Sequence, residues 1–209
     1  MSGDEPSAEY YAAIEEGARH HLSSKTYSGS FLRPHKAFLS GMIASLGCDS
    51  VLDVGAGKGV QYNWIDFRDG KTLEQAWGIE VHKYDPCWPP YAAEPKGKFD
   101  LVLCTHTISL IPLQDLDWWT ARLFGFARKG VFIAEKIGDR KKPEIGEPKA
   151  RAIGWAADKW VCYLGCQIPY GSPLTVVFSA REQTERGKIT TRHHWLKGVY
   201  QGGVEVESD

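Results

Sequence analysis

One short segment, residues 51–59, constrains this chain more than any other. It reads VLDVGAGKG, a run of branched apolar residues around one acid, followed by glycine at every second position. The three glycines are Gly55, Gly57 and Gly59. The apolar part suits a strand buried on both faces, as in a parallel sheet, and glycines suit a turn that closely approaches a ligand. Residues 58–64 can begin a helix whose first amides have no partner within it. The segment therefore predicts a nucleotide-binding turn.

The spacing of the glycines limits which nucleotide fits. A dinucleotide fingerprint, G-x-G-x-x-G, requires a third glycine where this chain has Val60, and a P-loop requires its second glycine at the same place. Asp53, two residues before the first glycine, would repel a pyrophosphate and attract an ammonium group. A ligand with adenosine at one end and a cationic amino acid at the other satisfies both constraints, and S-adenosylmethionine is such a ligand. A turn without a ligand is the alternative, and it leaves the acid unexplained.

The segment resembles motif I of the class I S-adenosylmethionine-dependent methyltransferases. The resemblance implies that the acid and the turn hold the methionine part and the ribose of S-adenosylmethionine. The residues concerned are Asp53, Gly55, Ala56, Gly57 and Gly59.

Residues 51–131, about two-fifths of the chain, are similar to a group of small methyltransferase-like proteins of bacteria and phages. These share a G-K-G-x-Q-Y turn, a Y-D-P end of the second strand and an F-D-x-V-x-C-T strand, found here at residues 57–62, 84–86 and 99–105. The similarity implies that Tyr62, Cys104 and Thr105 belong to the cofactor site.

Two acids compete for the ribose hydroxyls, which pair well with a carboxylate acceptor. Glu80 lies at the expected distance from the glycines, in a predicted strand over residues 77–81. Asp85 precedes Pro86, and it would end a longer strand. The resemblance favours Asp85, and Glu80 stays open.

His106 is the candidate catalytic residue. In the similar proteins an acid is expected soon after the Cys-Thr pair, whereas this chain has His106 there. An imidazole at a strand end could take a proton from the acceptor as the methyl group arrives, and a packing role is the equal alternative. Methyl transfer from a sulfonium depends mostly on alignment, so activity does not require a base.

The order of apolar runs and breaks predicts an α/β fold, a Rossmann-like doubly wound sheet that is mostly parallel with an antiparallel C-terminal hairpin. We expect a single domain over residues 1–209, with an N-terminal helical cap over 1–47 and an α/β core over 48–209. Helices are predicted over residues 7–22, 33–46 and 113–127, strands over 51–54, 77–81, 99–104 and 131–134, helical spacing over 148–163, and paired strands over 174–178 and 189–195. The prolines of residues 86–95 exclude a regular central strand.

Charge and composition give the chain no general attraction to nucleic acid or membrane. The formal net charge is -1, so nucleic-acid binding would need a local basic patch. We expect a cytoplasmic protein, because neither a secretory signal nor a membrane-spanning apolar run is present. Five scattered cysteines, Cys162 and Cys166 on one predicted helix face among them, suggest reduced thiols and no metal site.

The sequence thus predicts S-adenosylmethionine-dependent methyl transfer to an unidentified acceptor, with a small molecule favoured over a polymer. A nucleic-acid or protein methyltransferase would share every cofactor residue and is one alternative. The second is a catalytically inactive cofactor-binding or scaffold protein on the same fold. No sequence pattern specifies an oligomeric state.

Overall fold

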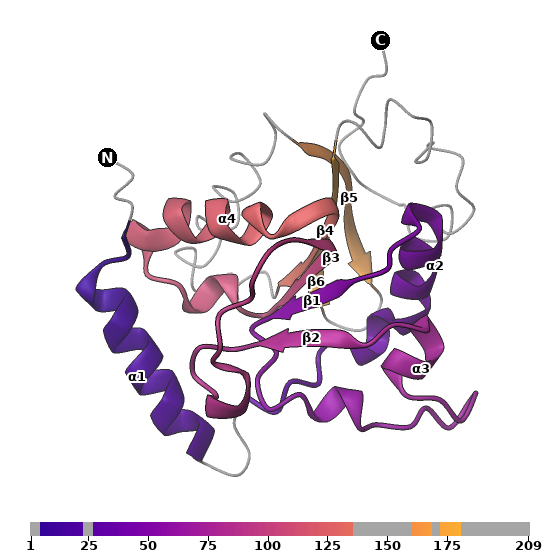
Figure 1. Cartoon of the computed structure of the whole chain (residues 1–209), viewed down its shortest axis with the longest axis horizontal. Coiled ribbons are helices and arrows are strands. Elements are labelled where there is room, and N and C mark those ends of the chain that lie inside the picture. The colour runs from indigo at the N-terminus through magenta and orange to yellow at the C-terminus, as the bar shows by residue number, and fades with distance from the viewer. Residues whose placement is uncertain (1–4, 23–26, 136–159, 169–171, 181–209) are drawn as a thin grey trace.

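A six-stranded sheet forms the centre of the molecule, with strand order β2-β1-β3-β4-β6-β5 (Figure 1). The computed structural model describes residues 5–22, 27–135, 160–168 and 172–180. Four strands form parallel pairs: β1 (Val51–Val54) with β2 (Val81–Tyr84) and β3 (Phe99–Thr105), and β3 with β4 (Ala127–Glu135). The last two, β5 (Trp160–Ile168) and β6 (Ser172–Ala180), pair with each other antiparallel, and β6 also runs antiparallel to β4.

Helices cover the two faces of the parallel strands. The helices are α1 (Ala8–Leu22), α2 (Lys36–Leu46), α3 (Leu73–Trp77) and α4 (Leu116–Gly125). Leu52 and Val54 belong to one buried cluster with α4 and Tyr10 of α1, whereas Val51 belongs to a second cluster with α2 and α3. Successive side chains of a strand point to opposite faces, so the parity of a residue in β1 decides which helices it meets.

The helices α1 and α2 cover different parts of the sheet. The arrowheads of β1 and β2 point toward α1, which lies across the carboxyl ends of these strands (Figure 1). The start of α1 is fastened to the start of α4, because Ser7 donates to Asp115 through both its amide and its hydroxyl, at 2.6 Å each. By contrast, α2 packs on the sheet and ends at Gly47, whose φ of 56° suits a left-handed helix cap. Of the two helices in the 1–47 segment, α1 alone covers the strand ends.

Two predicted elements near the glycine turn are wrong. Residues 58–64 form a single 3₁₀ turn, Val60–Tyr62, because Gly57 and Gly59 both have positive φ and hold the chain in a tight bend. Residues 77–81 do not form a strand: Trp77 ends α3 and Gly78 caps it in the left-handed region, so β2 begins only at Val81. The strand therefore ends at Tyr84, immediately before Asp85.

The C-terminal elements agree with the sequence only in part. Residues 174–178 lie in β6, as predicted for a strand. Residues 160–163 lie in β5 and not in a helix, and Cys162 and Cys166 are both part of this strand. The other predicted strand, 189–195, lies outside the described residues, and β6 pairs instead with β4 and β5. No helix within the described ranges has both the length and the apolarity needed to cross a bilayer.

Candidate functional site

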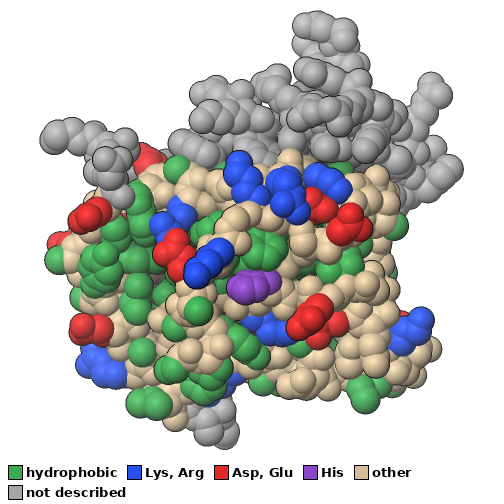
Figure 2. Space-filling model, viewed as in Figure 1, with side chains coloured by type: hydrophobic (Ala, Val, Ile, Leu, Met, Phe, Trp, Pro, Cys, Tyr) green, Lys and Arg blue, Asp and Glu red, His purple; other side chains and the backbone are tan. Residues whose placement is uncertain are grey.

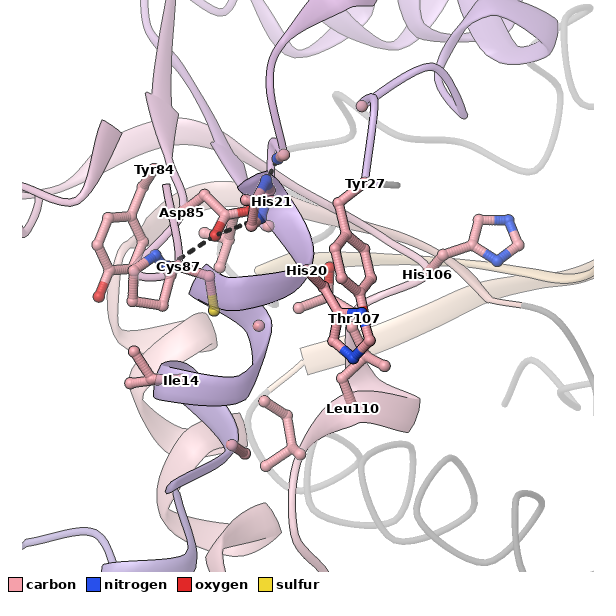
Figure 3. Close-up of a pocket in the computed structure, with 18 of the residues that line it drawn as sticks. Ile14, His20, His21, Tyr27, Tyr84, Asp85, Cys87, His106, Thr107 and Leu110 are labelled. Carbon is pink, nitrogen blue, oxygen red and sulfur yellow. Dashed lines mark hydrogen bonds and ion pairs between the residues drawn. The ribbon is translucent and has the colours of Figure 1, made fainter. Parts of the chain in front are cut away.

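A cavity of about 340 Å³ lies where β1, β2 and β3 end, between these strand ends and α1 (Figure 3). The carboxyl ends of parallel strands are where open α/β sheets bind ligands, and the volume is in the range of small-molecule sites. Its walls include Ile14, Gly17, His20 and His21 of α1; Tyr27, Gly29 and Phe31; Gly55 and Gly57; Tyr84, Asp85 and Cys87; and Thr105, His106, Thr107 and Leu110.

The glycine turn contributes to this cavity without offering amides to it. Every backbone N–H from Gly55 to Tyr62 donates within the protein. The amides of Gly55 and Ala56 donate to the Tyr84 carbonyl, and that of Gly57 donates to the Asp85 carboxylate. Within the turn, Gly59 donates to the Ala56 carbonyl and Tyr62 to the Gly59 carbonyl. The amides of Lys58, Val60 and Gln61 donate to the carbonyls of Tyr27, Ser28 and Gly29, respectively. The prediction of free amides at a helix N-terminus is therefore wrong. This turn therefore has no phosphate-binding site made of free backbone amides.

Residues 27–30, which precede the first sheet strand by more than twenty positions, hold the turn from outside. A Cβ added at Gly29 would collide with the Ala56 carbonyl oxygen, and one added at Gly57 would lie 2.5 Å from the Tyr27 carbonyl oxygen. Gly29 and Gly57 have φ of 68° and 58°, which glycine adopts at no steric cost. Two glycines thus let the two backbones touch, so the turn is built from two separate pieces of chain.

Asp53 is fully buried and does not line the cavity. It has the parity of Val51 and therefore points toward α2 and α3. One carboxylate oxygen, Oδ2, accepts from the Tyr62 hydroxyl at 2.7 Å and from the side-chain amide of Gln61 (Nε2) at 3.1 Å. The other, Oδ1, has no hydrogen-bond partner among the described residues. Burial raises the pKa of Asp53 to about 7, against the opposing effect of the Tyr62 hydrogen bond.

Asp85, the first residue after β2, does line the cavity. Its Oδ2 accepts from the Gly57 amide at 2.8 Å and its Oδ1 from the Cys87 amide at 2.9 Å. These two donors occupy two of the roughly four acceptor positions of a carboxylate. The Cys87 thiol is close by, and burial together with the charge of Asp85 raises the pKa of this weak donor to about 12. The thiol is also a hydrogen-bond partner of Asp85, so a ligand with two hydroxyls would take the remaining acceptor position and replace this weak donor.

Glu80 is not brought to this site. It is exposed, precedes the first residue of β2 and lines a different surface groove with Pro90 and Tyr91. The four residues of β2 separate the two competing acids, so only Asp85 stands at the carboxyl end of the strand.

His106 follows β3 and lines the cavity in a left-handed conformation, with φ of 53°. Its amide donates to the Ala134 carbonyl at 2.9 Å, and its ring packs on Phe31 with centroids 4.0 Å apart. In Figure 3 the imidazole points away from the group formed by Tyr27, Thr107 and Leu110. Tyr27 also has positive φ, so the two such non-glycine residues of the described ranges both line the cavity. Conformations of this kind concentrate at functional sites.

The remaining sequence candidates support the site from behind. Cys104 is fully buried in the cluster that contains α4, next to Thr105, which reaches the cavity. Ala56, Gly59 and Tyr62 do not line the cavity. Tyr62 instead binds Asp53 beneath the turn.

Sequence reasoning predicted an N-terminal helical cap but named none of the α1 residues that line the cavity. Gly17 lets this helix approach the strand ends, since a Cβ there would lie 2.6 Å from the Cys87 sulfur. His20 and His21 lie in the last turn of α1 and line the cavity. The adjacent histidines at the end of a predicted helix were the available signal, but helical periodicity does not say what a helix covers. Within the described ranges, no three His, Cys, Asp or Glu side chains lie close enough to hold a metal ion.

No family model matches the sequence, and no curated protein is similar to it in sequence. Several solved structures are similar in fold. One is the 1,6-didemethyltoxoflavin-N1-methyltransferase of Burkholderia thailandensis with bound 1,6-didemethyltoxoflavin and S-adenosylhomocysteine, at 17% identity and a TM-score of 0.50 over 86% of this chain and 93% of that one. The plantazolicin methyltransferase with S-adenosylhomocysteine gives 10% identity and a TM-score of 0.49 over 82% and 96%. The Synechocystis magnesium protoporphyrin IX methyltransferase with bound S-adenosylmethionine gives 14% and 0.44 over 79% and 89%.

The likeness to the Burkholderia enzyme shows that this chain has a Rossmann-like α/β fold of the kind found in class I methyltransferases.

Proposed function

We propose that the protein binds S-adenosylmethionine in the cavity under α1 and transfers its methyl group to a small acceptor. One observation carries the proposal: Asp85 presents spare acceptor positions to a cavity beside a glycine turn whose amides are all bonded. Two acceptor positions on one carboxylate suit the vicinal hydroxyls of a ribose. A turn without spare amides does not suit a pyrophosphate. The site therefore fits a nucleoside that carries no phosphate.

Other features support S-adenosylmethionine over a plain nucleoside. The Burkholderia methyltransferase of the same fold holds S-adenosylhomocysteine. The cavity extends from Asp85 past Gly55 and Gly57 to Thr105 and His106, so a ligand anchored at its ribose can run along the ends of β1 and β3. Asp53, which lies behind the turn, does not carry this argument, because its carboxylate faces Tyr62 and not the cavity.

Some residues would hold the cofactor, and others would border the reacting groups. S-adenosylmethionine supplies a methyl group on a positively charged sulfur, and the leaving sulfide is neutral. Asp85 would fix the ribose, and Gly55 and Gly57 would let the ligand lie against the backbone. Thr105 and His106 would border the reacting methyl group, where His106 could take the acceptor proton. Alignment of acceptor, methyl and sulfur would supply most of the rate gain.

A small acceptor is favoured because α1 covers the cavity and the visible surface carries no field of a single charge. Figure 2 shows Lys and Arg side chains interspersed with Asp and Glu on this face. Nucleic-acid binding depends on clustered cations that neutralise phosphates. A nucleic-acid or protein acceptor, and a protein that binds the cofactor without turnover, are outcomes that the following experiment separates.

The test is calorimetric titration of the purified protein with S-adenosylmethionine, S-adenosylhomocysteine, NAD and ATP. We expect the two adenosyl amino acids to bind and the two phosphate-bearing ligands to bind at least tenfold more weakly, since their phosphates find no free amide. Tighter binding of NAD or ATP would contradict the proposal, as would no binding of either adenosyl ligand. Methyl transfer from labelled S-adenosylmethionine to small-molecule, protein and RNA pools then identifies the acceptor class. Binding without transfer to any pool favours the inactive alternative.

A further inference from the structure

His21, the second-last residue of α1, is placed where it can control Asp85. Its side chain is 3% exposed, and its Nε2 lies 3.7 Å from Asp85 Oδ1. That separation is too long for a hydrogen bond but short enough for a strong charge interaction in a partly dry site. The other ring nitrogen, Nδ1, is buried and has no hydrogen-bond partner among the described residues. In Figure 3 His21 lies between Asp85 and Tyr27.

Aromatic rings hold the imidazole in this position. The His21 ring stacks on Trp88 at a centroid distance of 5.4 Å and an interplanar angle of 28°, and it packs on Tyr27 at 5.1 Å. A ring fixed on two sides has little freedom to turn away from Asp85. The His21 side chain therefore links α1 to the Asp85 carboxylate.

The charged and titratable groups around His21 come from three other segments. Asp85 follows β2, Lys58 belongs to the glycine turn, and Tyr27 belongs to residues 27–30. Burial lowers the pKa of His21, the Asp85 charge opposes this effect, and the Lys58 charge adds to it. The net direction is downward, so the imidazole is neutral at neutral pH.

We propose that His21 gates the nucleoside site: the neutral imidazole leaves Asp85 to the ligand hydroxyls, and the protonated imidazole pairs with Asp85 and weakens binding. The inference rests on the proposed function, because it assigns Asp85 to the ribose. A protonated ring would donate to Oδ1 and remove an acceptor position that the ribose needs. It would also repel the positive charge of S-adenosylmethionine. A bound ligand would bury the ring further, which also disfavours its charged form. All three effects have the same sign, so ligand binding and proton release are coupled.

The test measures binding of S-adenosylhomocysteine and adenosine by calorimetry from about pH 7.5 to about pH 4.5, in buffers with different ionisation enthalpies. Adenosine lacks the ionisable amine and carboxyl groups of S-adenosylhomocysteine, so the pH dependence of its affinity does not include the titration of those groups. For the wild type we expect constant affinity at the upper end, a fall approaching tenfold per pH unit on acidification, and a fraction of a proton released per ligand bound. His21→Phe, which keeps a ring against Trp88, and His21→Gln, which keeps a polar side chain, should both lose this slope and the proton release.

His82→Gln is the matched control, because His82 is exposed on β2, packs on Phe99 and does not line the cavity. This variant should keep the wild-type slope. Thermal melting of each variant reports on folding separately from binding. If the His21 variants keep the pH dependence, or if the wild type binds with none, the gate is wrong and the proposed function stands. If the wild type binds neither ligand at any pH, both proposals are overturned.

Discussion

Two carboxylates at neighbouring strand ends have opposite surroundings. Asp53 lies within β1, is fully buried, faces α2 and α3, and meets the neutral groups of Tyr62 and Gln61. Asp85 follows β2, lines the cavity under α1 and accepts from two backbone amides. Burial raises the pKa of Asp53 to about 7. Position relative to the sheet face, more than proximity to the glycines, therefore decides which of the two acids faces the cavity.

The two acids also hold the glycine turn from different sides. Asp85 binds the Gly57 amide from the cavity side. Asp53 holds Tyr62 and Gln61 from the opposite side, and Gln61 in turn accepts from the Leu32 amide at 2.9 Å. Asp53 is therefore a structural support of the turn, whereas Asp85 supports the turn and also lines the cavity.

The largest expected effect is that of Asp85→Asn on cofactor affinity. The substitution removes the charge and replaces one acceptor oxygen with a donor, so one of the Gly57 and Cys87 amides and one ribose hydroxyl would lose an acceptor. Hydrogen bonds to a charged group are each worth about 1.5–3 kcal/mol, so S-adenosylhomocysteine should bind about 100-fold more weakly by calorimetry. Glu80→Gln is the control and should leave the affinity unchanged. Equal losses in both variants would return the ribose role to an open choice.

The next effect concerns the outside support of the turn. Gly29→Ala places a Cβ against the Ala56 carbonyl at a positive φ and should lower the free energy of unfolding by about 2 kcal/mol more than Gly47→Ala does. Gly47 is a matched control, because its φ is also positive but an added Cβ meets nothing within 4 Å. Urea denaturation of both variants measures the difference. Equal stabilities would show that residues 27–30 can move off the turn at no cost.

Asp53→Asn should change stability in a pH-dependent way and change binding little. The pKa of Asp53 is about 7 when folded and about 3.9 when unfolded, so the folded protein holds the extra proton between these values. The wild type is thus most favoured at low pH and loses this contribution as the pH rises through about 7. Asparagine imitates the neutral acid, so the variant should be more stable than the wild type at pH 8, by on the order of 2 kcal/mol. The difference should vanish toward pH 4.

Thermal melts across this range check the stability, and calorimetry should show a change in affinity for S-adenosylhomocysteine below about threefold. An affinity loss as large as that of Asp85→Asn would remove the distinction between the two acids.

Tyr62→Phe should give the smallest effect. It deletes the 2.7 Å hydrogen bond to Asp53, which lowers the pKa of that acid, so the pKa should rise further above about 7. Loss of one buried hydrogen bond should cost about 1 kcal/mol in the free energy of unfolding. Carboxyl NMR of Asp53 across the pH range follows the titration directly. A downward shift of that pKa would mean that the hydroxyl does not stabilise the carboxylate.

The sequence predicted β1 and β3 because each is a mostly apolar run that ends at a break. The break after β1 is made of glycines, and the break after β3 is made of polar residues. Sequence reasoning misplaced β2 because Trp77 and Ile79 are as apolar as strand residues, while the Gly78 cap that ends α3 depends on a backbone angle that composition does not reveal. That error alone kept Glu80 in competition with Asp85. A correct boundary for β2 would have placed only Asp85 at the carboxyl end of the strand.

The site was predictable where it depends on residues adjacent in the chain and not where distant segments meet. Gly55, Gly57, Thr105 and His106 line the cavity and were predicted because each lies at or just after the end of a predicted strand, and Asp85 was predicted from the resemblance. The residues of α1 that line the cavity were missed, since a helix pattern does not show which side of the helix faces a cavity. The direction of Asp53 was missed as well, although strand parity with Val51 contains that information once the buried faces are assigned.

The bonding of the turn by residues 27–30 has a consequence for protein engineering. Transplanting residues 51–61 into another parallel sheet would carry the bend but leave behind the carbonyls of residues 27–29, which receive the amides of Lys58, Val60 and Gln61. Those freed N–H groups would attract anions, and the recipient would tend to select phosphorylated compounds. The full bonding of these amides thus depends on two stretches of polypeptide, and a graft would have to include both.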